Sequence, residues 1–276
     1  MNPFLINEPT CISLSGGRTS AYMLYRILEA HQMSLPEEAI VCFANTGKEA
    51  EETIRFVKAI EDNWGVEIHW LEYQNAEPSF KRVNFETASR NGEPFESLIH
   101  KKGYLPNPMS RYCSIEMKIR VIHKYLKSLG WSDHSERCDW VGIRADEQRR
   151  SSKIEKHRTP LVSAGVTKEI VGEFWRNSSF DLELPNNNGV TMHGNCDLSF
   201  LKHHSKILSL VNEKPERAIW WAGQEAWVES NGNPHGDGDK FRKDRPSYKE
   251  YLSFSKSQKD MFPISLLFVE RFLPLR

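Results

Sequence analysis

The chain has 276 residues, enough for one large domain or for a domain with an appended smaller part. Its 37 lysines and arginines balance 37 aspartates and glutamates, so the overall charge gives no reason to expect a nucleic-acid or membrane partner. No apolar run approaches the roughly 18 residues of a membrane-spanning helix, and the amino-terminal residues lack the pattern of a secretion signal. We therefore expect a cytoplasmic location.

A stretch near the amino terminus has the pattern of a strand, a glycine turn and a helix. Residues 11–14 are apolar, residues 15–20 read SGGRTS, and a helical face of apolar side chains follows (Ala21, Leu24, Ile27 and Leu28). In this layout the free N–H groups of the first helical turn favour a phosphate at the loop. The alternative is an ordinary turn in which a hydroxyl side chain caps the helix.

Two more strands follow, with an amphipathic helix between them. Residues 38–44 and 66–71 are mostly apolar, and the intervening helix presents one apolar face (Thr53, Phe56, Val57, Ile60 and Trp64). This alternation predicts a parallel sheet with helical crossovers. Ligands of such sheets bind beyond the carboxyl ends of the strands, so the SGGRTS loop and the turn at residues 45–47 are expected at one crevice.

Residues 75–110 are polar and rich in turn formers, without a long helical period, which is typical of a functional or a partly disordered connection. A helix is predicted from Arg111, with an inward apolar side (Ile115, Ile119, Ile122, Leu126 and Leu129) and a charged outer side (Lys118, Arg120, Lys124 and Lys127). The charged side is interpreted mainly as a solvated face. A fourth strand is predicted at residues 138–143, and Arg144 at its carboxyl end would pair with a phosphate.

The second half of the chain has weaker patterns. Residues 149–158 are strongly basic and either cover a polyanionic substrate or form a mobile loop. A helix is predicted at residues 167–175 and a strand-like segment at residues 180–184, followed by two helices after Phe200. The last part reads as a loop and then a tail with aromatic anchors (Tyr248, Tyr251 and Phe254).

Five segments together resemble the phosphoadenosine phosphosulfate reductase family of the PP-loop adenine-nucleotide hydrolases, and they occur in the family's order. They are SLSGGRTSAYML at 13–24, FANTGKEAEETIRFV at 43–57, RYCSIEMKI at 111–119, VGIRADEQRR at 141–150 and GNCDLSFLK at 194–202. The resemblance implies an α/β fold in which a parallel twisted sheet carries helices on both faces, plus a mainly helical C-terminal part. We expect a nucleotide-binding domain at 1–160, a cysteine-containing helical part at 161–230, and a loop and tail at 231–276.

The resemblance also implies a site for ATP or another adenine nucleotide. The phosphate loop would consist of Ser15, Gly16, Gly17, Arg18, Thr19 and Ser20. Other nucleotide-binding residues would be Ser13, Asn45, Thr46, Gly142, Arg144 and Arg149. The implied catalytic residues are Glu52, Arg144 and Asp146.

Two departures from the family pattern bear on the chemistry. The pyrophosphatase loop usually carries an aspartate where this chain has Thr19, so Mg²⁺ would need a carboxylate from Asp146, Glu147 or Glu52. Sulfonucleotide reductases carry a nucleophilic cysteine near the C-terminus, whereas no cysteine follows Cys196 here. Adenylation is therefore ranked above reduction.

The five cysteines suggest ligands or buried thiols rather than disulfides. Cys11 and Cys42 lie in apolar strands and are predicted in the core. Related sequences bind an iron–sulfur cluster through a G-N-C-x-x-C motif, but Ser199 replaces the second cysteine here. Cys113, Cys196 and Cys138 remain as tentative ligands of an iron–sulfur cluster or of zinc, and loss of the cluster is the equal alternative.

The preferred function is an enzyme that binds ATP or a related nucleotide and adenylates an acceptor for sulfur transfer. The alternatives are a sulfonucleotide reductase and a non-catalytic, nucleotide-binding accessory subunit. The expected partners are the nucleotide, a sulfur-donor protein and a second copy of the chain. The basic stretches at 118–127 and 149–158 would allow a nucleic acid, for which the neutral overall charge gives little support.

Overall fold

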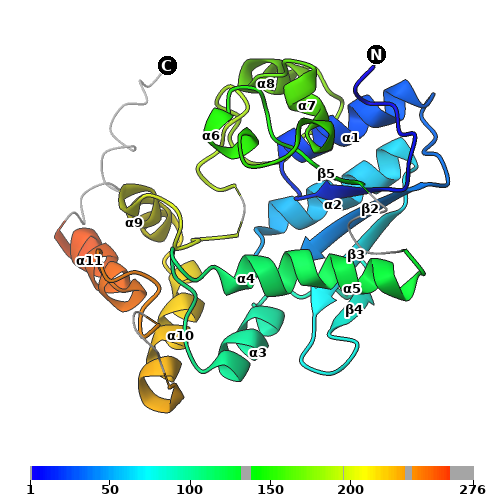
Figure 1. Cartoon of the computed structure of the whole chain (residues 1–276). Coiled ribbons are helices and arrows are strands. Elements are labelled where there is room, and N and C mark those ends of the chain that lie inside the picture. Colours follow the sequence, from blue (N-terminus) through cyan, green and yellow to red (C-terminus); the bar gives the residue numbers. More distant parts are fainter. Residues whose placement is uncertain (1, 132–137, 195, 234–237, 262–276) are drawn as a thin grey trace, which may run out of the picture. The chain divides into compact units, whose positions relative to one another are not determined.

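The computed structural model describes residues 2–131, 138–194, 196–233 and 238–261 (Figure 1). The chain forms two compact units. The first contains Met1–Lys101 and Arg111–Asp197, and the second contains Lys102–Ser110 and Leu198–Arg276. The first unit thus extends beyond residue 160, the limit expected for the nucleotide-binding domain.

A five-stranded sheet in the order β4-β3-β2-β1-β5 forms the centre of the first unit. Its strands are β1 (Thr10–Leu14), β2 (Ala39–Asn45), β3 (Ile68–Tyr73), β4 (Phe80–Val83) and β5 (Cys138–Val141). The four predicted strands are parallel, which confirms the α/β class, and β4 adds an antiparallel edge that was not predicted. The two middle residues of β4 are exposed, so its sequence has no continuous apolar run.

Helices cover both faces of this sheet, as predicted (Figure 1). The face that includes Ile12 and Leu14 packs on α1 (Arg18–Ala30) and α2 (Glu51–Trp64), and α8 (Lys168–Arg176) packs on α1. The other face packs on η1 (Ile115–Ile119) and α5 (Arg120–Ser128). Successive strand residues point to opposite faces, so Cys11 and Ser13 lie on the α5 side. Cys11 and Cys42 are buried, as predicted.

The remaining elements of the chain are short connections and a helical part. The connections are α3 (Glu93–Lys102), α4 (Tyr112–Ser114), α6 (Gln148–Ser151), the 3₁₀ turn η2 (Lys156–Arg158) and α7 (Pro160–Ser163). Helix α3 lies in the stretch of residues 75–110, in which the sequence shows no long helical period. Only two of its turns carry apolar side chains, which is too short a run to show a clear period.

The helix predicted from Arg111 has a π-helical segment, η1, in its middle. A π turn contains an extra residue, so it rotates the side chains that follow relative to a regular α-helix. Ile115 and Ile119, which were predicted to face inward, are 46% and 50% exposed. Leu129 is also exposed, and Met117, Val121 and Tyr125 are buried instead. The regular period of 3.6 residues therefore gave the wrong inward face for part of this helix.

In the described part of the second unit, three helices surround an aromatic cluster. They are α9 (His204–Glu213), α10 (Arg217–Asn231) and α11 (Tyr248–Met261). The presence of α11 corrects the expectation of a loop and tail without helical structure. Tyr248 and Tyr251 are buried, as anchors should be, whereas Phe254 is 47% exposed. Trp221 lies at the centre of the cluster, in contact with Phe200, Phe241 and Tyr248. No helix within the described residues is long and apolar enough to cross a membrane.

A half-buried carboxyl group joins α10 to α11 in this unit. Oε2 of Glu225 accepts a hydrogen bond from the backbone N–H of Tyr248 at 2.8 Å. Burial raises the pKa of Glu225 to about 7, from an ordinary value of 4.5. The folded protein therefore holds this proton to a higher pH than the unfolded chain does.

We predict that this carboxyl makes the protein less stable as the pH rises through the interval between those two pKa values. In that interval the folded state binds more protons than the unfolded state, so the free energy of unfolding falls with pH. Glu225→Gln should weaken this dependence and raise the melting temperature at pH 8 relative to wild type. Thermal unfolding at several pH values measures it, with Glu229→Gln, an exposed residue on the same helix, as the control. Equal pH profiles for all three proteins would contradict the prediction.

Candidate functional site

The loop between β1 and α1 is held in shape by its own hydroxyl groups. The Ser20 hydroxyl accepts a hydrogen bond from the Ser15 backbone N–H at 3.0 Å and donates one to the Gly17 carbonyl at 3.0 Å. The Ser15 and Ser20 hydroxyl oxygens lie 2.9 Å apart. Ser20 is buried, so its hydroxyl serves the loop itself rather than pointing at a ligand.

The glycines of the site have two different functions. Gly16 has φ +74°, and an added Cβ would lie 2.5 Å from Cγ2 of Thr53. Gly142, just after β5, packs on the loop, because an added Cβ would lie 2.8 Å from the Ser20 Cα. Above Gly17 the nearest atom to an added Cβ is 3.7 Å away. Gly16 and Gly142 therefore allow close packing, and Gly17 leaves open space next to the backbone.

A cavity of about 360 Å³ opens at this loop. Its lining comes from residues 15–19, from Gly142, Arg144, Glu147 and Arg150 after β5, and from residues 189–191 and 194. Helix α1 begins here without a side-chain cap among the described residues. The N–H groups of its first turn therefore remain available to an anion in the cavity. The cavity lies beyond the carboxyl ends of β1 and β5, where the chain changes from one face of the sheet to the other.

Arg144 lies at the cavity with its guanidinium group held in place. One nitrogen donates to the Thr19 hydroxyl at 3.0 Å, and the group forms a two-bond contact with the Asp146 carboxylate at 2.9 and 3.1 Å. Hydrogen bonding to Arg144 holds the pKa of Asp146 below its ordinary value. Asp146 also accepts a bond from the Lys168 backbone. Asp146 is thus an anchor for Arg144, and the predicted pair of Arg144 and Asp146 does come together.

Arg18 is directed away from the open part of the cavity. Its guanidinium binds the Asp181 carboxylate through two bonds of 2.7 Å and donates to the carbonyls of Leu182 and Leu184 at 2.6 Å. The segment at residues 180–184 was predicted as strand-like, but the structure has no strand there. Its backbone is bound by Arg18 rather than by a neighbouring strand. The Arg18 side chain therefore holds one wall of the cavity.

The wall opposite the loop also rests on a backbone contact with α8. An added Cβ on Gly172 would lie 2.6 Å from the backbone N of Gly189. Gly189 has φ +79°, and an added Cβ there would lie 2.5 Å from the Lys168 carbonyl oxygen. The backbone at Gly189 therefore packs directly against the backbone of α8.

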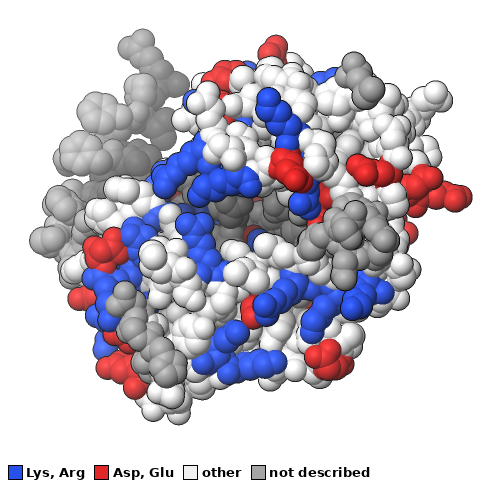
Figure 2. Space-filling view, in the orientation of Figure 1, with Lys and Arg blue, Asp and Glu red and all other residues white. Residues whose placement is uncertain are grey.

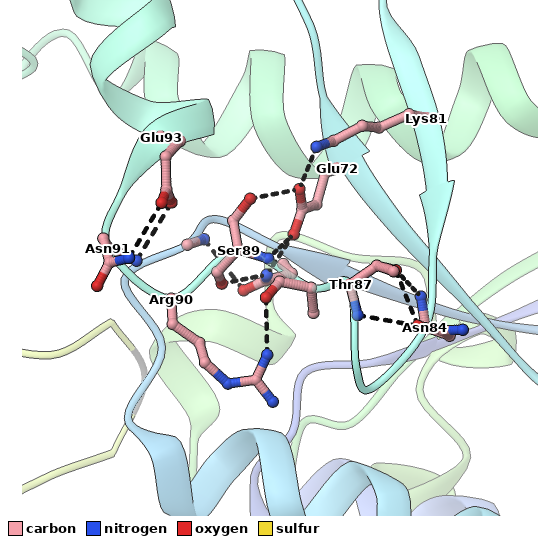
Figure 3. Close-up of polar contacts among 11 residues, drawn as sticks. Glu72, Lys81, Asn84, Thr87, Ser89, Arg90, Asn91 and Glu93 are labelled. Carbon is pink, nitrogen blue, oxygen red and sulfur yellow. Dashed lines mark hydrogen bonds and ion pairs between the residues drawn. The ribbon is translucent and has the colours of Figure 1, made fainter.

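Asn45 belongs to a buried polar network rather than to the cavity lining. Its amide donates to Glu72 at 2.6 Å and to the Ser89 carbonyl at 2.8 Å, and its oxygen accepts from the Gly47 N–H. Figure 3 shows Ser89 and Lys81 pointing at the Glu72 carboxylate, to which both bind. This network fixes the turn after β2 against the loop at residues 84–93.

Thr46 belongs to a second cluster at the same turn. Its hydroxyl donates to Oε1 of Glu49 at 3.1 Å, and the Cys196 sulfur lies 3.6 Å from the same oxygen. The Lys118 ammonium group pairs with this carboxylate at 3.2 Å. Oε2 of Glu49 is buried without a hydrogen-bond partner among the described residues. Burial raises the pKa of Cys196 to about 12, and the Glu49 charge adds to that shift.

The three predicted metal ligands do not form one group. Cys113 lies near Cys196, close enough to influence its pKa, and burial raises the pKa of Cys113 as well. Cys138 begins β5, beside Thr10 at the start of β1, whereas Cys196 lies beyond the end of β2. Among the described residues, no three cysteine, histidine or acidic side chains are placed to hold a metal ion. The residues therefore do not fit a four-thiolate cluster.

The other predicted residues, Glu52, Arg149 and Ser13, do not line this cavity. Glu52 is on the first turn of α2, next to Thr53, and its Oε2 is buried without a partner in the part of the chain that the structure describes. Arg149 is exposed on α6, and its neighbour Arg150 lines the cavity. Ser13 lines a separate cavity of about 250 Å³ on the α5 side of the sheet.

Several residues of the site were not predicted from the sequence. Arg150 and residues 189–191 line the cavity, and the buried Glu49 pairs with the half-buried Lys118. The basic run at 149–158 was a usable signal for Arg150. The turn at residues 185–189 ends in a glycine, which indicates that its backbone packs closely against another part of the chain. The sequence does not indicate that this part is α8.

A mostly parallel sheet with a glycine loop that leads from β1 into an uncapped helix defines an α/β protein of the PP-loop class. Residues 9–161 match the phosphoadenosine phosphosulfate reductase domain, and the chain belongs to that family. It is 27% identical over 207 residues to the uncharacterized nin region protein ORF290 of Escherichia phage lambda, covering 71% of this chain and 67% of the phage protein. It is also 27% identical over 162 residues to an uncharacterized protein of Methanocaldococcus jannaschii, covering 58% of this chain and 28% of that protein.

The buried ion pair of Arg18 yields a prediction about stability. Arg18→Met should lower the free energy of unfolding by about 3 kcal/mol, because it leaves carbonyls and a carboxylate without their donor. The control is Arg55→Met, which breaks an exposed pair between Arg55 and Glu183 in the same segment. That change should cost less than about 1 kcal/mol. Denaturant unfolding of both variants measures the difference, and equal losses would contradict a structural role for Arg18.

Proposed function

We propose that the first unit binds ATP or a related adenine nucleotide with its phosphates at the loop of residues 15–19, and that it adenylates an acceptor for sulfur transfer. The open space above Gly17, next to the uncapped start of α1, is the observation that carries this proposal. A phosphate there would accept bonds from backbone N–H groups. Arg144 would add a charge-assisted bond from the end of β5.

The cavity beside Ser13 supports the binding of a base as well as phosphates. It is lined by three isoleucine side chains (Ile119, Ile122 and Ile154) and by strand residues of β1 and β5. Ser13 is in β1 and lines this cavity, and Ser15 follows two residues later in the loop and lines the other cavity. The apolar lining suits the faces of a purine ring, and the polar groups at its edge would pair with the ring's edge.

Arg144 is assigned to binding and to stabilising charge on the phosphates. Asp146 is a positioning residue, because its carboxylate holds the Arg144 guanidinium. Oε2 of Glu52 lacks a hydrogen-bond partner among the described residues, and Glu52 remains the proposed acid–base residue. Of the three carboxylates considered for Mg²⁺, Asp146 and Glu147 already pair with Arg144, and no step is assigned to a metal ion.

Reduction of a sulfonucleotide is the less favoured activity. A thiol attacks sulfur as the thiolate, and burial raises the pKa of both Cys113 and Cys196. A thiol with a pKa near that of Cys196 is almost fully protonated at neutral pH. The two activities also differ in their products, pyrophosphate for adenylation and sulfite for reduction.

The first test of the proposal concerns the glycine loop. Gly17→Val should keep the fold, since an added Cβ meets only the Ser15 hydroxyl at 3.7 Å, but it should block the approach of phosphate. We expect ATP affinity measured by calorimetry to fall by at least about tenfold, the value of one charge-assisted bond. Gly223→Val, whose side chain meets no atom within 4 Å on α10, is the matched control. Unchanged ATP binding by Gly17→Val would place the nucleotide elsewhere.

The second test measures the reaction. Purified protein given ATP, Mg²⁺ and candidate acceptors should release pyrophosphate, and Arg144→Ala should release it at least about tenfold more slowly. Sulfite release from a sulfonucleotide with thioredoxin would instead identify a reductase. ATP binding without either product would favour the accessory subunit.

A further inference from the structure

The neutral charge of the chain conceals a strong local excess of positive charge. Residues 111–127 and 144–158 together carry a net charge of +7, which leaves −7 on the rest of the chain. Both segments lie in the first unit. They also supply residues to the two cavities, Arg144 and Arg150 to one and Ile119 and Arg158 to the other. The excess positive charge is therefore concentrated around the proposed site.

One row of basic side chains runs along α6 and η2. Arg149, Lys153 and Lys156 are exposed there, and none has an acidic partner within the described residues. Unpaired exposed cations attract a polyanion more strongly than cations in ion pairs, because their charge is not already neutralised. Figure 2 shows blue side chains close to the position of α6 in Figure 1.

A second row runs along the outer side of α5. Arg120, Lys124 and Lys127 are exposed on it, and Figure 2 shows blue side chains along this helix too. Arg120 pairs with Glu116, and Nζ of Lys124 lies 3.6 Å from Oε1 of the exposed Glu77. Lys127 has no acidic partner in the described part of the chain. Arg120 and Lys127 are seven positions apart, which is about 10 Å along the helix axis. This row is therefore longer than a single phosphate group could contact.

We propose that these two rows bind the phosphate backbone of a nucleic acid, and that this nucleic acid is the acceptor of the reaction. The bound nucleotide would place its phosphates at Arg144 and the loop, so the outlying lysines lie beyond what it uses. A polymer with one phosphate per residue would cover both rows at once. That the nucleic acid is the acceptor rests on the proposed function. Nucleic-acid binding itself does not, because it is measured without ATP.

The cavity that residues of α5 and of the 154–158 segment line together has side chains that suit a nucleic acid. Ile119 is half exposed at the mouth of the cavity that also contains Ser13 and Arg158. A half-exposed isoleucine beside arginines offers apolar contact to a base and charge to the backbone. An acidic peptide could also bind to the positive charge, but it has no phosphate groups and no bases. The experiment therefore includes polyglutamate as a competitor.

The experiment is fluorescence anisotropy with labelled single-stranded DNA, single-stranded RNA and duplex DNA of about 20 units, at about 50 and 200 mM salt. The test variant replaces Lys124, Lys127, Lys153 and Lys156 by glutamine. The control replaces four exposed or half-exposed basic residues on α2 and α8 by glutamine (Arg55, Lys58, Lys168 and Arg176). Both variants change the charge equally, and both are first checked for wild-type melting.

The test variant should bind at least about tenfold more weakly than wild type at the lower salt, and the control should bind like wild type. The slope of log affinity against log salt should be smaller by about three, close to the value for four lost phosphate contacts. Equal weakening of both variants would overturn the proposal. So would competition by polyglutamate or by anionic lipid vesicles that equals competition by nucleic acid of the same charge.

The two proposals fail in different ways. If calorimetry detects no ATP binding but the oligonucleotides bind through the lysines, the proposed function fails and the nucleic-acid surface stands. If ATP binds and the lysine variant holds every oligonucleotide as tightly as wild type, the surface fails and the proposed function stands.

Discussion

The ion pair between Arg18 and Asp181 connects the two sides of the candidate site. It joins the first turn of α1 to a segment more than 160 residues later, and carbonyls of Leu182 and Leu184 accept further bonds from the same guanidinium. Removing a guanidinium from water is costly, and only a full set of acceptors offsets that cost. Trp175 adds a bond to the Arg18 carbonyl at 2.9 Å. These contacts hold residues 181–185 of that segment at a fixed distance from the glycine loop.

This pair also shows where sequence reasoning reached its limit. The strand, loop and helix at residues 10–30 were predictable, because apolar periodicity and glycines are local signals. The direction of the Arg18 side chain was not, because an arginine in a glycine loop looks like a phosphate ligand until its acceptors are known. Those acceptors come from a segment without regular structure, which was predicted as strand-like.

Other differences have equally specific causes. The π turn at residues 115–119 changed which isoleucines face solvent, and no residue pattern in that helix announces the extra residue. Asn45 and Thr46 were predicted at the crevice as nucleotide-binding residues, but their polar atoms bind Glu72 and Glu49, two acidic residues that only the folded chain brings close. The position of Arg144 at the end of a strand was predictable, since strand ends in a parallel sheet share one edge.

The contact between Gly172 and Gly189 sets the width of the cavity in a way that side chains cannot adjust. Both sides of this contact are main chain, so the gap between α8 and the far wall is already at its minimum. Any larger residue at either position would push the wall toward the glycine loop and reduce the room for a ligand. Lining residues such as Val190 and Thr191 can therefore be exchanged to alter which ligand fits, while the spacing of the two walls stays constant.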